Sequence, residues 1–167
     1  MTNKDIENLL QQYFSKGLLV DTNILLLFFV GSVSRERINR FRRTEQFSSL
    51  DYDLLVDLFR RFKVIATTPN ILTEISNLIN QLDEPDRSEC YKVFASGIAF
   101  LEETYLPSRD VASSYWPFSK YGLTDCGIAE LAQNKYLVLT GDLRVTRYFN
   151  DRGIDTVNFN NLRYHQL

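Results

Sequence analysis

Short apolar runs alternate along the chain with longer segments whose apolar residues recur every three or four positions. The runs are brief and bounded by turn residues, which favours buried strands, although periodicity alone does not separate them from buried helix. Strands are expected over residues 18–21, 64–67, 136–140 and 154–159. Because helical segments separate these runs, the pattern predicts an α/β fold with a central parallel sheet of about four to five strands flanked by helices.

The segments between the runs carry helical spacing together with capping residues. Helices are expected over residues 4–16, from a cap at 22 or 23 to 31, over 51–62, from 69 onward, over 85–103, over 125–135, and between 142 and 153. Residues 107–122 are mixed, because Trp116 and Pro117 interrupt any long helix. No repeat or linker divides the chain, so residues 1–167 are expected to form a single domain, with a longer helical and basic segment at about 31–63.

Composition narrows the class of protein. The chain has 167 residues, is 44% hydrophobic and has a net charge of -2, so it carries no basic field over the whole molecule. Cys90 and Cys126 follow neither a metal spacing nor a disulfide framework, and we expect both to be small buried hydrophobes in a reducing compartment. The chain start lacks a signal-peptide core and no apolar stretch would span a bilayer, so a cytoplasmic protein without a membrane partner is expected.

Four acidic residues lie where a parallel sheet would bring them to one edge. Asp21 ends the first apolar run, Asp142 follows the third, Glu74 lies in the second turn of a helix after the second, and Asp125 opens the helix that leads into the third. Ligands of open α/β sheets bind outside the carboxyl ends of the strands. Carboxylates gathered there would repel one another unless a cation neutralised them, so the pattern predicts a divalent metal site.

Each acid also has a plain structural interpretation. Asp21 or Asp142 could cap a helix, Asp125 could complement a helix dipole, and Glu74 could be solvated. Taken singly, these interpretations are the better ones, and the convergence of four acids at one edge favours a site. His165, the one histidine of the sequence, lies in a polar tail and is expected to be solvated.

The ordered set of motifs resembles the PIN-domain nucleases and covers nearly the whole chain. The matching segments are LVDTNIL (19–25), TTPNILTE (67–74), TDCGIAELA (124–132), VLTGD (138–142) and TVNF (156–159). The chain departs from small VapC-type toxins of that family at residues 31–63, which form a longer region with an arginine cluster. That departure bears on the toxin assignment more than on the chemistry.

The resemblance implies a metal-dependent endonuclease that uses Mg²⁺ or Mn²⁺ and usually cuts RNA, with DNA as the second substrate. By position, Asp21, Glu74, Asp125 and Asp142 form its acidic quartet. Asp21 and Asp142 are expected to be direct ligands, Asp125 to be a ligand or to hold a water, and Glu74 to position or deprotonate the attacking water. Asn23 and Thr140 match supporting polar positions, with local capping as the alternative.

The resemblance leaves the biological setting open among a toxin with an antitoxin protein, a defence nuclease and an RNA-processing enzyme, and it suggests a homodimer. The basic segment is expected either to contact phosphates or a partner, or to form a solvated face paired with Glu36 and Glu45. Its residues are Arg35, Arg37, Arg40, Arg42 and Arg43.

Two other functions compete with the nuclease. One is a PIN fold that serves as a non-catalytic binding or scaffold module. The other is a phosphatase of the haloacid-dehalogenase type, which needs a second Asp where this chain has Asn23. Nucleotide-binding folds are disfavoured, because neither a GxGxxG motif nor a P-loop is present.

Overall fold

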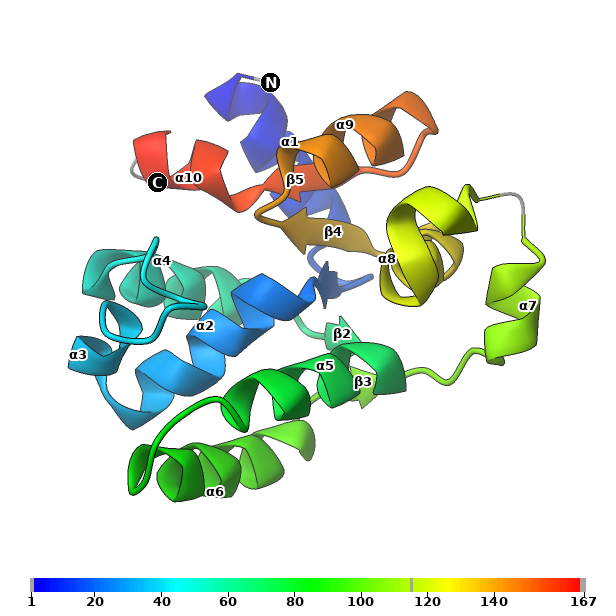
Figure 1. Ribbon diagram of the computed structural model, residues 1–167. Coiled ribbons are helices and arrows are strands. Elements are labelled where there is room, and N and C mark those ends of the chain that lie inside the picture. The colour runs from blue at the N-terminus through cyan, green and yellow to red at the C-terminus, as the bar shows by residue number, and fades with distance from the viewer. Residues whose placement is uncertain (1, 115, 166–167) are drawn as a thin grey trace.

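The described part of the protein is built around a five-stranded, all-parallel sheet (Figure 1). The computed structural model describes residues 2–114 and 116–165. The strands follow the order β3-β2-β1-β4-β5 across the sheet. Their bounds are β1 Leu18–Val20, β2 Ile65–Thr67, β3 Glu102–Glu103, β4 Leu137–Thr140 and β5 Thr156–Asn158. The expected α/β class with a parallel sheet and flanking helices is therefore confirmed.

Helices connect every pair of consecutive strands, as parallel pairing requires. The first half of the chain contains α1 Asn3–Tyr13, α2 Thr22–Val33, α3 Arg35–Ile38, α4 Ser49–Arg60 and α5 Pro69–Ile79. The second half contains α6 Asp86–Ile98, α7 Ser108–Ala112, α8 Phe118–Ala132, α9 Leu143–Asp151 and α10 Phe159–His165. No helix among the described residues is both long and apolar enough to cross a membrane.

The sheet order fixes where a ligand would bind. The chain moves from β1 out to β2 and β3, then returns across the sheet to β4 and β5. Right-handed crossovers that run in opposite directions put their helices on opposite faces, so both faces are covered. The strand order reverses between β1 and β4, and the crevice at the carboxyl ends of these two strands is the usual ligand site of such sheets.

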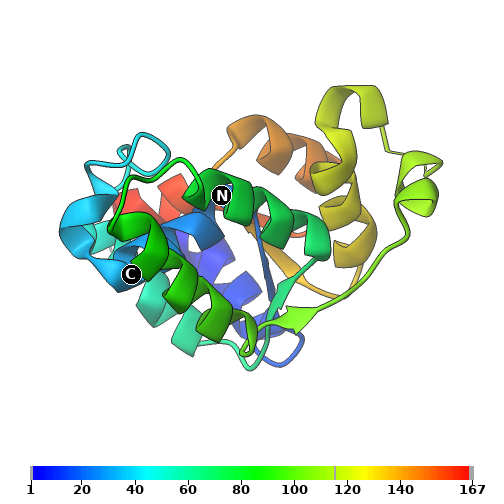
Figure 2. The same ribbon diagram turned by 60° about the horizontal axis from the view of Figure 1, so that its bottom comes forward.

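Helix α2 is the central helix of one layer. Its residues from Ile24 to Leu27 are fully buried, and it packs against α3, α4, α5 and α6. Figure 2, turned to bring this side forward, shows α5 and α6 in green as neighbouring rods over this layer. A helix that is apolar all round is typical of a protein interior. Because α2 begins directly after β1, this packing fixes the position of Asp21, its N-terminal cap.

Several boundaries differ from the expectations. The helix expected over residues 85–103 ends at Ile98, and Glu102–Glu103 pair with β2 as a short edge strand. Their side chains are exposed, so no apolar run marks this strand. The mixed segment 107–122 contains α7 and the start of α8, which continues across a kink at Gly122. The last strand stops at Asn158, where α10 begins. Cys90 and Cys126 are buried and unpaired with each other, as expected.

Candidate metal centre

All four acids line one cleft of about 320 Å³ at the crevice between β1 and β4. Asp21 follows β1, Asp142 follows β4, Glu74 comes from α5 and Asp125 from α8. Four separate segments of the chain therefore bring carboxylates to one place. Asn23, on the first turn of α2, lines the same cleft and is exposed.

Asp21 is held on both oxygens. Its Oδ1 accepts a hydrogen bond from the main-chain N–H of Thr22 at 2.6 Å, which caps α2. Its Oδ2 accepts one from the hydroxyl of Thr140 at 2.8 Å. Burial raises the pKa of this carboxyl, the bonds from Thr140 and Thr22 oppose the shift, and the charges of Glu74 and Asp142 raise it further. A charge held in this way favours a nearby cation.

Two threonine hydroxyls fix Glu74. Thr22 donates to Oε2 at 2.8 Å, and Thr124 donates to Oε1 at 2.5 Å. Thr22 belongs to α2 and Thr124 to α8, so Glu74 joins three helices at the cleft. Both carboxylate oxygens are satisfied, and the side chain has a defined orientation.

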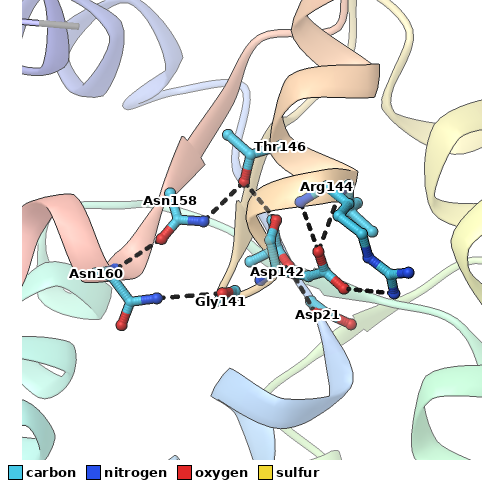
Figure 3. Close-up of polar contacts among 9 residues, drawn as sticks. Asp21, Gly141, Asp142, Arg144, Thr146, Asn158 and Asn160 are labelled. Atoms are coloured by element: carbon cyan, nitrogen blue, oxygen red, sulfur yellow. Dashed lines mark hydrogen bonds and ion pairs between the residues drawn. The ribbon is translucent and has the colours of Figure 1, made fainter.

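Asp142 caps α9. Its Oδ1 accepts hydrogen bonds from the main-chain N–H groups of Arg144 at 2.6 Å and Val145 at 3.2 Å. The guanidinium of Arg144 lies 3.5 Å from Oδ2 (Figure 3). Thr140 links this residue to Asp21, because the same hydroxyl that donates to Asp21 accepts the Asp142 N–H at 3.1 Å. The turn therefore couples the two acids at the switch point.

A polar network behind the turn supports Asp142 (Figure 3). Thr146 donates to the main-chain oxygen of Asp142 at 2.7 Å, and the amide of Asn158 donates to the Thr146 hydroxyl at 2.9 Å. Asn160 donates to the main-chain oxygen of Gly141 at 3.2 Å. Asn158 is buried at the end of β5. The fifth strand thus helps to orient an acid that follows the fourth.

Asp125 is the exception among the four. No hydrogen bond to its carboxylate comes from any residue that the structure describes, whereas each of the other three accepts at least two. Burial raises its pKa to about 7, and the charges of Asp21, Asp142 and Glu74 add to the rise, while Arg144 opposes it. Burial and the surrounding acids therefore both disfavour the charged form of this carboxyl.

The donor set suits a hard divalent cation, although the side chains are not arranged as a finished ligand cage. Within the described residues, no three His, Cys, Asp or Glu side chains already form a group that could hold a metal ion. Their oxygens instead bond to neighbouring hydroxyls and N–H groups. Mg²⁺ and Mn²⁺ prefer oxygen ligands, and Mg²⁺ keeps several waters while taking few carboxylates directly. A cleft lined by four carboxylates fits that kind of coordination.

The arginine segment lies away from this cleft. It follows the C-terminal end of α2, whereas Asp21 precedes the N-terminal end, and twelve helical residues span about 18 Å. Arg35 pairs with Asp53 and Arg37 with Asp86, rather than with the expected Glu36 and Glu45. A second cleft of about 320 Å³ is lined by arginines and aspartates of this region. Its charged lining residues are Arg37, Arg40, Arg42, Asp83 and Asp86.

Some residues that line the cleft or contact its acids were not identified from the sequence. The hydroxyls of Thr22 and Thr124 hold Glu74, and Arg144 lies beside Asp142. Thr22 directly follows Asp21, and Arg144 comes two residues after Asp142. Their closeness to these acids in the sequence could have identified both of them. Tyr121 also lines the cleft, and nothing in its spacing marked it. The side chain of His165 lies outside the described residues.

Comparison with protein-family models and with curated proteins finds no match to this chain.

Proposed function

We propose that the chain is a Mg²⁺- or Mn²⁺-dependent endonuclease that hydrolyses phosphodiester bonds, foremost in RNA. The observation that carries the proposal is the gathering of four carboxylates from four chain segments in one cleft at the switch point of the sheet. Purely capping or solvated acids would have no reason to share one cleft. The resemblance of the motifs to PIN-domain nucleases points to the same reaction.

The cation would neutralise charge on the phosphate and supply an activated water, which are the two needs that a cluster of acids does not meet alone. Asp21 and Asp142 are the proposed direct ligands, because helix caps fix both of them at the ends of adjacent strands. Asp125 is the third ligand or the acceptor for a water. Its lack of hydrogen-bond donors among the described residues leaves both of its oxygens available for this role.

Glu74 is proposed to position the attacking water. The hydroxyls of Thr22 and Thr124 hold both its oxygens, so its carboxylate stays in one orientation beside the other acids. Arg144 is mostly exposed, and its guanidinium lies 3.5 Å from Oδ2 of Asp142. A phosphate that enters the cleft would therefore contact the guanidinium of Arg144 as well as the bound metal ion.

A binding or scaffold role for the same fold is the second candidate. The observation that favours it is that no group of three or more metal-binding side chains is preformed among the described residues. A phosphatase of the haloacid-dehalogenase type is less well supported, because Asn23 stands in the cleft where that chemistry uses a second acid. An antitoxin partner and a homodimer belong to the proposal as biological settings of the nuclease.

The decisive experiment is cleavage of a structured RNA and of a single-stranded DNA with Mn²⁺ or Mg²⁺, with EDTA as the metal-free control. Metal-dependent cutting by the wild type that is lost in the Asp21→Asn/Asp142→Asn variant is the expected result. The comparison of the two polymers gives the substrate preference. Equal cutting by both proteins would mean a contaminating nuclease.

A matched control guards the interpretation. Asp151 is an exposed carboxylate at the other end of α9 from Asp142. Asp151→Asn removes the same charge from the same helix and should leave cleavage unchanged. Wild type that binds RNA without cutting it under any of these conditions would support the binding module instead.

A further inference from the structure

The acid cleft has an apolar wall that a metal site alone does not require. Beside the four carboxylates it is lined by Leu78, Tyr121, Leu123 and Val145. Carboxylates and a cation would deal with a phosphate, which offers no apolar surface. We therefore expect another part of the ligand, one that is flat or apolar, to contact this wall.

Tyr121 is the aromatic residue of the wall, and its ring is held in place from behind. It stacks on the ring of Tyr148 with centroids 4.5 Å apart and an interplanar angle of 23°. Trp116 meets Tyr148 edge to face at 6.1 Å, and the guanidinium of Arg152 lies 5.1 Å from the Tyr148 centroid. The Tyr148 hydroxyl is buried without a hydrogen-bond partner in the described part of the chain. The contribution of Tyr148 is therefore the packing of its ring against Tyr121.

The kink in α8 lets one helix contribute both the ring and an acid. Gly122 has a φ of 73°, a left-handed conformation that glycine adopts without strain, and it separates Tyr121 from the turn that carries Asp125. Both residues line the same cleft. The exposed ammonium of Lys120 lies 5.0 Å from the Tyr121 centroid, so a cation already occupies a position over this ring.

We propose that Tyr121, backed by Tyr148, is a stacking platform for a nucleobase next to the phosphate bound at the acid cleft. This inference rests on the proposed nuclease function and adds a positioning residue to it. Aromatic side chains stack on bases of any sequence, because every base has a π-face. Lys120 would move aside to the neighbouring phosphate, as a long exposed side chain can.

The test measures binding rather than cutting. A fluorescent single-stranded oligoribonucleotide and a matched abasic strand with the same backbone are titrated with the protein in Ca²⁺, and anisotropy gives both Kd values. Wild type should bind the strand with bases at least about tenfold more tightly, in line with stacking worth roughly 1–3 kcal/mol per base. Tyr121→Ala should remove most of that preference, and Tyr121→Phe should keep it.

Two further variants make the outcome decisive. Tyr105→Ala removes an exposed tyrosine that does not line the cleft and should bind like the wild type. Tyr121→Leu keeps apolar volume without a ring face, and it replaces the alanine variant if that one fails to fold. Melting curves establish which variants are folded.

Two results would overturn the platform. One is a wild type that binds both strands equally. The other is a folded Tyr121→Ala or Tyr121→Leu variant that keeps the wild-type preference, or that loses affinity for both strands by the same factor, as a purely structural role would cause. Failure of the nuclease proposal looks different, since absent cleavage leaves the base preference measurable.

Discussion

At the scale of the residue, the four acids of one cleft have different surroundings. Asp21, Glu74 and Asp142 each accept at least two hydrogen bonds from the described residues. Asp125 accepts none from the described residues and has a pKa raised to about 7. The pKa of Asp21 is raised as well, by burial first and further by the charges of Glu74 and Asp142, so the cost of gathering the four charges falls on both of these carboxyls.

The first prediction concerns pH. The ordinary pKa of the Asp125 carboxyl is 3.8 and the folded protein raises it to about 7, so the folded state holds a proton that the unfolded state has lost between these values. In EDTA, the free energy of unfolding should therefore fall as pH rises from about 4 to about 7, and the raised pKa of Asp21 adds to this fall. Thermal or urea unfolding across this range measures it.

Asp125→Asn isolates this carboxyl. The variant should reduce the pH dependence to the part that Asp21 contributes and, at pH 8 without metal, gain about 1–3 kcal/mol, or roughly 3–10 °C in Tm. Asp151→Asn, which changes an exposed carboxylate outside the cleft, should follow the wild-type curve. A variant no more stable than the wild type at pH 8 would show that neither burial nor the neighbouring acids disfavour the charge of Asp125.

The second prediction concerns the cation. Mn²⁺ or Mg²⁺ should raise the Tm of the wild type, because a ligand that binds the folded state alone stabilises it. The rise should be larger at pH 8 than at pH 5.5, since Asp125 must lose its proton before it can contribute a charge. The Asp21→Asn/Asp142→Asn variant should show no rise. Equal shifts in both proteins would indicate binding elsewhere.

The positions of these acids could be predicted from the sequence, while their individual states could not. Asp21 follows its strand directly and Asp142 comes two residues after the end of the neighbouring strand, so parallel pairing of the two strands brings them together. The hydroxyls of Thr22 and Thr124 come from different helices and meet Glu74 only after packing. The pKa of a carboxyl depends on such contacts, and spacing along the chain does not contain them.

At the scale of the element, α2 shows how packing sets the position of a site residue. Its C-terminal half touches α4 closely at Gly31, where a Cβ would run into the ring of Tyr52. The ring of Tyr52 packs against the ring of Phe28, with centroids 6.4 Å apart. The hydroxyl of Tyr52 lies 3.1 Å from the hydroxyl of Ser32 and shares a hydrogen bond with it. The two helices can therefore approach this closely because residue 31 is a glycine and has no side chain.

The third prediction tests this contact. Gly31→Ala should destabilise the protein by about 1–3 kcal/mol, because the added methyl overpacks a buried contact. Gly127→Ala is the matched control, since a Cβ there meets nothing within 4 Å and alanine favours a helix. Chemical denaturation measures both. An unchanged free energy of unfolding in Gly31→Ala would mean that the ring of Tyr52 can move. Helices α2 and α4 would then be less tightly packed than this contact implies.

The elements themselves differ in how well their sequence marks them. The runs at 18–20 and 137–140 are fully buried and, apart from Thr140, apolar, so they were predicted to within a residue. Glu102–Glu103 form a strand by pairing at the sheet edge with exposed charged side chains, a case in which only tertiary contact reveals the strand. The kink at Gly122 was likewise hidden, because a lone glycine does not specify its φ.

At the scale of the whole molecule, α2 separates two charged regions. The acid cleft lies at its N-terminal end and the arginine segment follows its C-terminal end. The net charge of -2 conceals this separation. A long nucleic acid could contact both regions, whereas a short one in the cleft could not reach the arginines.

The fourth prediction follows from that distance. Charge reversal at Arg40 and Arg43 should weaken binding of a long RNA and reduce the slope of log K against log salt by about 1–2, since each lost phosphate contact lowers it by roughly 0.7. Binding of a short oligonucleotide should not change. Reversal of Lys92 and Arg109, two exposed cations outside both clefts, gives the same net charge and serves as the control. Unchanged binding of the long RNA at all salt concentrations would assign the segment to another partner or to solubility.

Asp21 and Asp142 each cap the N-terminus of a helix and also line the cleft. These two roles limit which substitutions the two positions can accept. A change to alanine at either position would remove the repulsion but also the helix cap, which contributes about 1 kcal/mol. A change to asparagine keeps the cap and removes only the charge. Asparagine is therefore the substitution that would remove the charges of the proposed metal site while both helix caps remain. A homologue with asparagine at both positions is expected to keep the fold without the proposed cation site.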